Sequence, residues 1–166
     1  MNIITAIDAS TELFISSFRS ETLDTVMLAV TSLFSTPTVL TVLALLCALA
    51  ILCRECRSNA LTISGAIVLS FLVSESVKLF FMRVRPEAIP AAFGLEHTFS
   101  FPSSHSAIAA ALFCAWGLIF WKQIRKDPVL KSLLAISIMA AMSLIAFSRA
   151  YLRVHYATDA IAGMFL

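Results

Sequence analysis

The chain has 166 residues, of which 60% are hydrophobic and 13% are charged, and its formal net charge is +2 at pH 7. A soluble domain of this length could not bury so much apolar surface, so the composition excludes an ordinary soluble protein. The sequence predicts an all-α integral membrane protein whose partners are membrane lipids, with no nucleic acid among them.

The first 35 residues are predicted to form an N-terminal interfacial segment. Residues 3–18 carry Ile and Phe on a loosely helical stripe with acids between them, which favours a helix lying along the membrane surface; a frayed polar tail is the alternative. A second apolar run, 23–34, is too short to span once Asp24 is counted. Acidic residues in the first 25 positions also exclude a cleaved signal peptide.

A transmembrane domain is predicted over residues 36–166. Crossing the hydrocarbon layer takes about 20 apolar residues in a helix, and four stretches reach that length: 36–53, 60–82, 103–121 and 129–148. Residues 158–166 begin a further apolar helix with no stop signal. We therefore expect a polytopic helical bundle with four full spans and the start of a further, truncated span; completion by a partner is the alternative.

Three polar blocks, 78–86, 102–105 and 148–159, fall at the ends of these spans. Because successive spans alternate in direction, all three blocks are expected on one face of the membrane. The opposite face receives a group of cations: Arg54, Arg57, Lys122, Arg125, Lys126 and Lys131. Cytoplasmic loops collect Lys and Arg, so the polar blocks are predicted to be extracytoplasmic.

Some residues near the span ends are predicted to have ordinary roles. Arg19, Arg83 and Arg153 are interpreted as flanking cations. Cys53 and Cys56 form a C-x-x-C pair at the predicted cytoplasmic edge, where free thiols are expected.

The first polar block supplies cations. Lys78 and Arg85 are about two helical turns apart, so they share one face if the helix continues to Arg85. Together with Arg149 of the third block they suit an anion with two negative charges; taken alone, Lys78 could equally snorkel to the headgroups. Glu75 lies one turn before Lys78 in the same apolar run, and we hypothesise that it positions Lys78.

The second block predicts a phosphate cradle. Ser103 and Ser104 follow Pro102 at the start of a helix, where exposed N–H groups and the positive end of the helix dipole attract phosphate. Taken singly, such serines are more often N-caps. His105 raises the functional interpretation because it would stand beside the phosphate as a proton donor.

The third block predicts a nucleophile. His155 and Asp159 have i, i+4 spacing, which allows the carboxylate to hold one imidazole nitrogen and leaves the other free to attack phosphorus. A metal site built from His105, His155 and Asp159 is the alternative. It is disfavoured because the three nearby cations would repel a divalent ion, so neither a metal nor another cofactor is expected.

The three blocks together resemble the type 2 phosphatidic acid phosphatase superfamily over roughly residues 22–166. The matching patterns are Lys-x6-Arg-Pro at 78–86, Pro-Ser-x-His at 102–105 and Ser-Arg-x5-His-x3-Asp at 148–159. The resemblance implies that His155 becomes a phosphohistidine, that Asp159 orients it and that His105 protonates the leaving oxygen. It also implies a set of phosphate-binding residues: Lys78, Arg85, Ser103, Ser104 and Arg149.

This resemblance leads us to expect a metal-independent phosphatase of a bacterial inner membrane. Undecaprenyl diphosphate, phosphatidic acid and phosphatidylglycerol phosphate are all open as substrates. Ser104 stands where the family usually has glycine, and Arg153 where relatives often have a small residue. Two other interpretations stay open: a non-catalytic lipid-phosphate binder or carrier, and a small subunit of a membrane complex.

Overall fold

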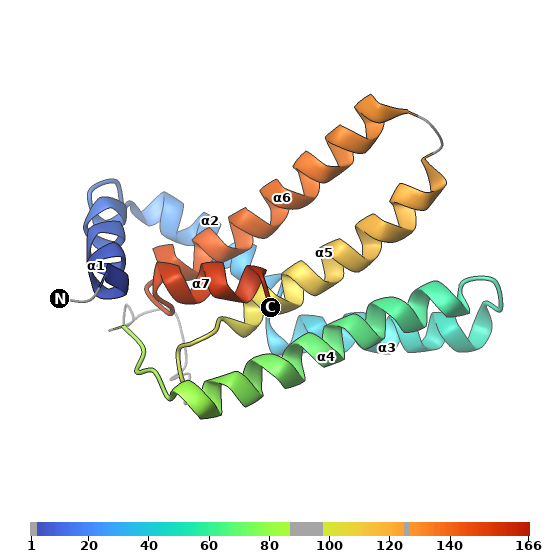
Figure 1. The fold of residues 1–166 in the computed structure, drawn as a ribbon, viewed down its shortest axis with the longest axis horizontal. Helices are drawn as coiled ribbons and strands as arrows, with labels where there is room; N and C mark the ends of the chain where they lie inside the picture. The colour runs from blue at the N-terminus through green and yellow to red at the C-terminus, as the bar shows by residue number, and fades with distance from the viewer. Residues whose placement is uncertain (1–2, 87–97, 125–126) are drawn as a thin grey trace.

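The computed structural model describes residues 3–86, 98–124 and 127–166. Within these ranges the chain forms seven helices (Figure 1): α1 Ile3–Ser16, α2 Glu21–Ser32, α3 Thr36–Leu52, α4 Arg57–Phe81, α5 Ser104–Gln123, α6 Pro128–Tyr151 and α7 Ala157–Met164. This architecture confirms the all-α prediction.

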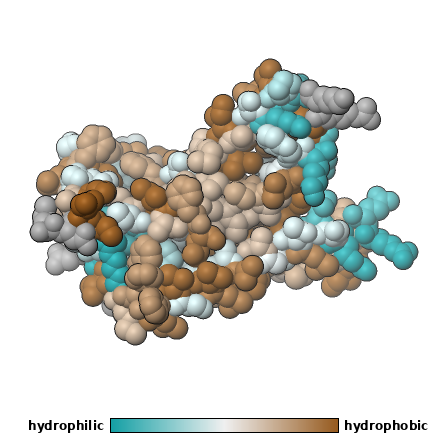
Figure 2. Space-filling model, viewed as in Figure 1, coloured by the Kyte–Doolittle hydropathy of each residue, from teal (hydrophilic) through white to brown (hydrophobic). Residues whose placement is uncertain are grey.

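Four helical segments in the described ranges are long and apolar enough to cross a membrane: Glu21–Leu52, Arg57–Phe81, Ser104–Gln123 and Pro128–Tyr151. The first of them contains α2 and α3, which are separated by a short turn. Hydrophobic side chains cover much of the visible surface of the molecule (Figure 2). A surface of this kind is stable against lipid, so the chain is an integral membrane protein.

Local chemistry sets where the helices begin. The Ser20 hydroxyl accepts a hydrogen bond from the backbone N–H of Leu23 at 3.3 Å and caps α2. Asp127 caps α6 in the same way through the N–H of Leu130 at 3.0 Å, and Pro128 occupies the first helical position. The observed limits of α3, α4, α5 and α6 all fall within three residues of the apolar runs that predicted these helices.

The connection between α3 and α4 differs from the prediction. Cys53 and Cys56 form a disulfide, with their Cα atoms 5.3 Å apart, so the expectation of free thiols is wrong. The short turn brings the two side chains together because a C-x-x-C spacing places both Cα atoms within disulfide range.

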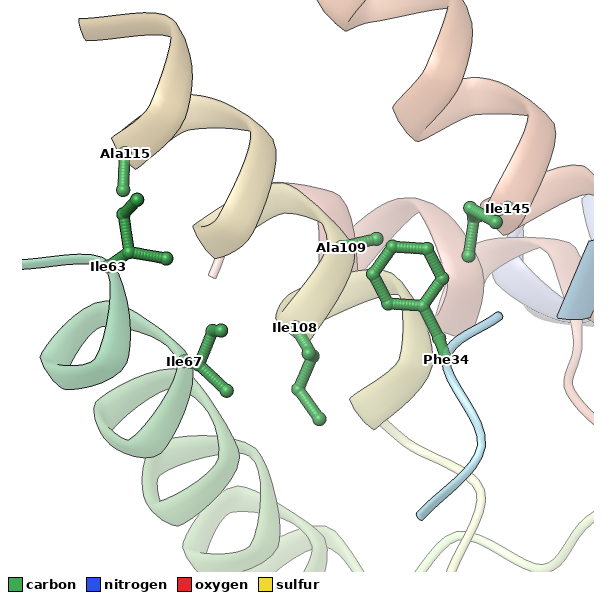
Figure 3. Packing of buried hydrophobic residues seen from close by; sticks show 7 residues of the cluster. All are labelled: Phe34, Ile63, Ile67, Ile108, Ala109, Ala115 and Ile145. Carbon is green, nitrogen blue, oxygen red and sulfur yellow. The ribbon is translucent and has the colours of Figure 1, made fainter. Parts of the chain in front are cut away.

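The main hydrophobic core lies between α4, α5 and α6 and includes Phe34 from the turn between α2 and α3 (Figure 3). Its buried members are Phe34, Ile63, Ile67, Ile108, Ala109, Ala115 and Ile145. Alanines on α5 allow the neighbouring helices to approach closely, which is how transmembrane helices gain packing energy.

The ends of the helices that carry the polar blocks meet at one end of the bundle. In Figure 1 the C-terminal ends of α4 and α6, the start of α5 and the whole of α7 lie together, whereas the α3–α4 and α5–α6 connections lie at the other end. Polar residues colour the tips of that opposite end in Figure 2. Arg125 and Lys126, two of the cations predicted there, lie outside the described residues.

The N-terminal helices are attached to this polar end of the bundle. α1 contacts α7 and α6, and α2 contacts α6. A second apolar cluster joins them: Ile15, Met27, Tyr151, Leu152 and Val154. Residues 3–16 are therefore a packed helix in the structure, not a frayed tail.

Candidate active site

α4 ends before the second cation of the first block. Its last residue is Phe81, and Met82 takes a left-handed conformation with φ 47° and ψ 34°. Lys78 lies buried in the last turn of the helix, and Arg85 extends from the irregular segment that follows. Because the helix does not continue to Arg85, Lys78 and Arg85 do not share one helix face. Lys78 reaches the site from α4 and Arg85 from the irregular segment after it.

Glu75 connects the first and second blocks. Its Oε1 atom accepts a hydrogen bond from Lys78 Nζ at 2.8 Å and another from Ser104 Oγ at 2.8 Å. The pairing of Glu75 with Lys78 agrees with the hypothesis that Glu75 positions this lysine. Ser104 therefore binds Glu75 through its hydroxyl, a contact that the glycine usual at this position in the resembled family could not make.

Ser103 is the N-cap of α5 and is completely buried. Its hydroxyl accepts hydrogen bonds from Ser106 N at 3.4 Å and from Ser106 Oγ at 3.1 Å. Its backbone N–H donates to the carbonyl of Asp159 at 3.1 Å. α7 approaches so closely that a Cβ on Gly163 would lie 2.4 Å from the Ser103 carbonyl oxygen.

His155 is 2% exposed and has a partner at each ring nitrogen. Nδ1 lies 2.7 Å from the carbonyl oxygen of Ser100, and Nε2 lies 3.1 Å from Nη1 of Arg85. A carbonyl can only accept and a guanidinium can only donate, so Nδ1 carries the proton and Nε2 presents its lone pair. This tautomer is the one that a histidine nucleophile requires at Nε2.

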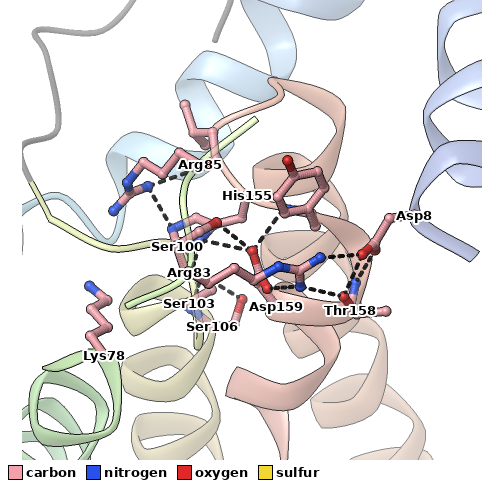
Figure 4. A network of polar contacts seen from close by, with 12 residues as sticks. Asp8, Lys78, Arg83, Arg85, Ser100, Ser103, Ser106, His155, Thr158 and Asp159 are labelled. Atoms are coloured by element: carbon pink, nitrogen blue, oxygen red, sulfur yellow. Dashed lines mark hydrogen bonds and ion pairs between the residues drawn. The ribbon is translucent and has the colours of Figure 1, made fainter. Parts of the chain in front are cut away.

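Asp159 holds His155 indirectly in this structure (Figure 4). The closest carboxylate oxygen is 4.0 Å from His155 Nδ1, beyond hydrogen-bond range. That oxygen, Oδ2, instead accepts hydrogen bonds from Ser100 Oγ and from the backbone N–H of Tyr156, the latter at 3.1 Å. The direct contact expected from i, i+4 spacing is replaced by a link through Ser100.

Two residues of this arrangement were not identified from the sequence. Ser100 contributes its carbonyl, which no side-chain pattern reveals. Arg83, interpreted above as a flanking cation, donates from Nη1 to Asp159 Oδ1, and its Nη2 lies 2.5 Å from Oδ2 of Asp8. The interpretation of Arg83 is therefore wrong, because the residue lies between two carboxylates.

The other flanking cations are also paired. Arg19 donates to Asp24 at 3.0 Å, and Arg153 forms an ion pair with Glu12 of α1. Neither partner belongs to the three polar blocks.

Arg149, in the last turn of α6, is 1% exposed and reaches α2. Its guanidinium donates to Thr31 Oγ1 at 2.8 Å. Its carbonyl oxygen accepts a hydrogen bond from the backbone N–H of His155 at 3.3 Å. Arg149 thereby fixes the backbone of His155 and places a third positive charge near its ring.

The electrostatic setting keeps His155 neutral. Burial away from water lowers its pKa well below the ordinary value of 6.5, and the positive charges of Arg149, Arg85 and Lys78 lower it further. The imidazole therefore retains its Nε2 lone pair under mildly acidic conditions.

A cavity of about 400 Å³ opens beside these groups. Polar residues line one end of it: Glu75, Lys78, Thr98, Ser104, His105 and His155. The remaining lining residues are apolar apart from Thr36: Phe34, Val39, Leu40, Leu43, Ile67, Val68, Phe71 and Ile108. A ligand with a charged group and a hydrocarbon tail matches this division.

Comparison with solved structures supports the same fold. The crystal structure of a transmembrane PAP2-type phosphatidylglycerolphosphate phosphatase from Bacillus subtilis matches with a TM-score of 0.82 at 26% identity, covering 99% of this chain and 80% of that one. The crystal structure of Aquifex aeolicus LpxE matches with a TM-score of 0.64 at 24% identity, covering 99% of this chain and 93% of that one; this second likeness concerns the fold alone.

Sequence comparison agrees with the structural one. The chain is 35% identical over 98 residues to phosphatidylglycerophosphatase B of Bacillus subtilis strain 168, a match to 57% of this chain and 46% of the relative. The chain thus spans less than half the length of this curated relative. The model of the PAP2 superfamily matches residues 59–166, a segment that contains all three polar blocks. Because this match covers well over half of the residues and the fold agrees with it, the chain belongs to the PAP2 superfamily.

Proposed function

We propose that the protein is a lipid-phosphate phosphatase that hydrolyses a phosphomonoester or a diphosphate through a phosphohistidine at His155. The observation that carries the proposal is the neutral His155 tautomer, whose Nε2 lone pair lies beside cations at the polar end of a cavity that is otherwise apolar. A binder or carrier would need the cations but no such nucleophile.

The proposed reaction has two steps. First, Nε2 of His155 attacks phosphorus, the bond between phosphorus and the leaving oxygen breaks, and His105 donates a proton to that oxygen. Then a water molecule attacks the phosphohistidine, gives a proton to His105, and the N–P bond breaks to release phosphate. His105 lines the same cavity as His155, which supports its role in both proton transfers.

The proposed phosphate-binding residues surround this reaction. Lys78, Arg85 and Arg149 would neutralise the phosphoryl oxygens, and Arg85, now bonded to Nε2, would transfer its hydrogen bond to the incoming phosphate. Ser103 and Ser104 would contribute from the start of α5, where the dipole favours an anion.

We propose that no metal takes part. The proposal depends on charge: three cations already act on His155, and they would oppose a divalent ion at the same place. In the described part of the chain, no group of three or more His, Cys, Asp or Glu side chains has the arrangement of a metal site.

The substrate candidates are undecaprenyl diphosphate, phosphatidic acid and phosphatidylglycerol phosphate. The name shared by the Bacillus subtilis sequence match and structure match supports the last of these. All three combine a phosphate with a hydrocarbon tail, as the cavity requires.

We further propose a bacterial inner membrane location with the site on the extracytoplasmic face. The cations Arg54 and Arg57 at the opposite end of the bundle support this orientation. A cysteine introduced at Lys131, in a variant with all native cysteines replaced by serine, should be shielded from a membrane-impermeant maleimide in spheroplasts. Labelling of this cysteine before permeabilisation would show that the protein has the opposite orientation.

The central test is phosphate release by the detergent-purified protein in the presence of a chelator. The three lipids should be compared for the wild type and for His155→Ala, with circular dichroism as a check of folding. Release by the wild type alone, together with an acid-labile phosphoenzyme that the variant lacks, is the expected result. A folded wild type that binds these lipids and releases no phosphate would favour a carrier.

A further inference from the structure

α1 buries a carboxylate while exposing apolar side chains. Asp8 is 5% exposed, whereas Ile3 is 77% exposed and Phe14 is 67% exposed. Apart from Ile15, which packs in the second apolar cluster, this reverses the usual pattern of a helix packed on a protein, in which apolar residues face inward. A buried carboxylate is costly unless it is paired, so the contacts of Asp8 must account for its position.

Both carboxylate oxygens of Asp8 have partners. Oδ2 accepts hydrogen bonds from Arg83 Nη2 at 2.5 Å and from Thr158 Oγ1 at 2.9 Å. Oδ1 accepts from the backbone N–H of Thr158 at 3.0 Å. Asp8 therefore attaches α1 to the segment after α4 and to the first turn of α7.

Arg83 extends this contact toward the candidate site (Figure 4). Its Nη1 atom donates to Asp159 Oδ1 and to Thr158 Oγ1, the latter at 2.8 Å. Its guanidinium carbon lies 4.2 Å from the centre of the Tyr156 ring. Its carbonyl accepts the backbone N–H of Ser100 at 2.7 Å, so one residue holds both groups that determine the position of His155.

We propose that Asp8 is a positioning residue: it fixes the guanidinium of Arg83, which in turn fixes Asp159, the carboxylate that binds the Ser100 hydroxyl beside His155. An arginine fork binds a lone carboxylate through two parallel hydrogen bonds. By taking Nη2, Asp8 restricts Arg83 to one oxygen of Asp159 and leaves Oδ2 for Ser100. The role assigned to Asp8 rests on the proposed function of His155.

A second ion pair on α1 provides a matched control. Glu12, one helical turn after Asp8, pairs with Arg153, and these side chains are 37% and 36% exposed. This pair also joins α1 to the loop after α6, and within the described parts of the chain no hydrogen bond or ion pair links it to Asp159 or Ser100. Glu12→Gln therefore weakens the attachment of α1 and leaves the contacts from Asp8 through Arg83 to Asp159 intact.

The test uses the full chain in detergent and four variants: Asp8→Asn, Glu12→Gln, Arg83→Gln and the double variant Asp8→Asn/Arg83→Gln. We expect Asp8→Asn to lower kcat by about 10- to 100-fold through misplacement of His155, with KM changed less than about twofold. The double variant should be no slower than Arg83→Gln alone, because the two residues act in series. Glu12→Gln should keep the wild-type kcat.

A spectroscopic readout separates positioning from loss of folding. The chain has three histidines, so ¹⁵N-histidine spectra are simple to assign with His155→Ala. Asp8→Asn should shift the His155 ring resonances, and Glu12→Gln should leave them in place. If Asp8→Asn fails to fold, Arg83→Lys replaces it: an ammonium keeps the charge without the planar fork and should produce the same loss of kcat.

Equal kcat values for Asp8→Asn and Glu12→Gln, additive losses in the double variant, or an active Arg83→Lys would overturn the role of Asp8. Absence of phosphate release by the wild type would instead refute the proposed function. In that case the His155 resonances still report whether Asp8 controls the ring.

Discussion

The carbonyl oxygen of Ser100 lies 2.7 Å from His155 Nδ1, whereas the carboxylate of Asp159 lies 4.0 Å from the same atom. Ser100 also donates its hydroxyl to Asp159, so it stands between the acid and the imidazole. Asp159 can therefore orient His155 without touching it.

This relationship predicts the effect of Ser100→Ala. The variant keeps the carbonyl that accepts from Nδ1 but removes the hydroxyl that ties it to Asp159. Turnover should fall about tenfold through loss of orientation, with little change in KM. Steady-state kinetics beside the exposed-site control Ser16→Ala would measure this. Unchanged turnover would mean that Asp159 acts on His155 directly when substrate is bound.

Glu75 should control how Lys78 meets the phosphate. Glu75→Gln removes the charge that holds the lysine, and kcat/KM should fall about tenfold, the effect of losing one charge-assisted hydrogen bond. Ser104→Ala deletes only the second contact of Glu75 and should have a smaller effect. Glu55→Gln, an exposed acid at the α3–α4 turn, is the control. A similar kcat/KM for all three variants would show that Glu75 does not position Lys78 for phosphate binding.

Gly163 is required for the contact between α7 and α5. A methyl group there would lie 2.4 Å from the Ser103 carbonyl, a backbone atom that cannot move independently. Gly163→Ala should lower the free energy of unfolding by about 1–3 kcal/mol, the usual cost of overpacking.

Gly65 provides the control for this substitution, since nothing lies within 4 Å of a Cβ at that position. Gly65→Ala should be neutral or stabilising by up to about 1 kcal/mol, because alanine favours a helix more than glycine does. Thermal unfolding of both variants in the same detergent makes the comparison. Equal melting temperatures would contradict the close approach of α7.

The lowered pKa of His155 predicts how the stability of the folded protein depends on pH. Because burial and three cations lower this pKa, the folded protein should keep the ring neutral at pH values where an exposed histidine is protonated. Between pH 6.5 and the lowered value the unfolded chain binds more protons. His155 therefore contributes stability that is complete above pH 6.5 and is lost as the pH falls toward the folded pKa.

An NMR titration of ¹⁵N-labelled histidine measures this pKa without interference from ionisation of the substrate. Arg85→Gln should move the His155 pKa upward, since one of the three cations is removed. A midpoint at or above 6.5 in the wild type would contradict the prediction.

The sequence was sufficient to predict the spans and the end of the bundle at which the polar blocks meet. Span length and alternating direction are local properties, and they place Lys78, His105 and His155 at one end without knowledge of packing. The helix limits were less predictable. Pro86 disfavours a helical conformation at Arg85, but Met82 has no intrinsic preference for a left-handed conformation, so nothing in the sequence placed the end of α4 at Phe81.

The partners of Asp159 could not be predicted for a physical reason. Arg83 has the same appearance in sequence whether it snorkels to headgroups or lies between carboxylates. Ser100 holds His155 through a backbone carbonyl, which every residue possesses. Asp8 bonds to a residue 150 positions away, and no local periodicity records such a contact.

The hydrogen bond from Arg149 to Thr31 has a consequence for dividing the chain. The family match begins at residue 59, yet Thr31, outside the match, accepts a hydrogen bond from the buried guanidinium of Arg149, inside it. Residues 1–58 and 59–166 should thus behave as complementary fragments: neither is expected to reach the native bundle when expressed alone, and co-expression of the two should reconstitute it.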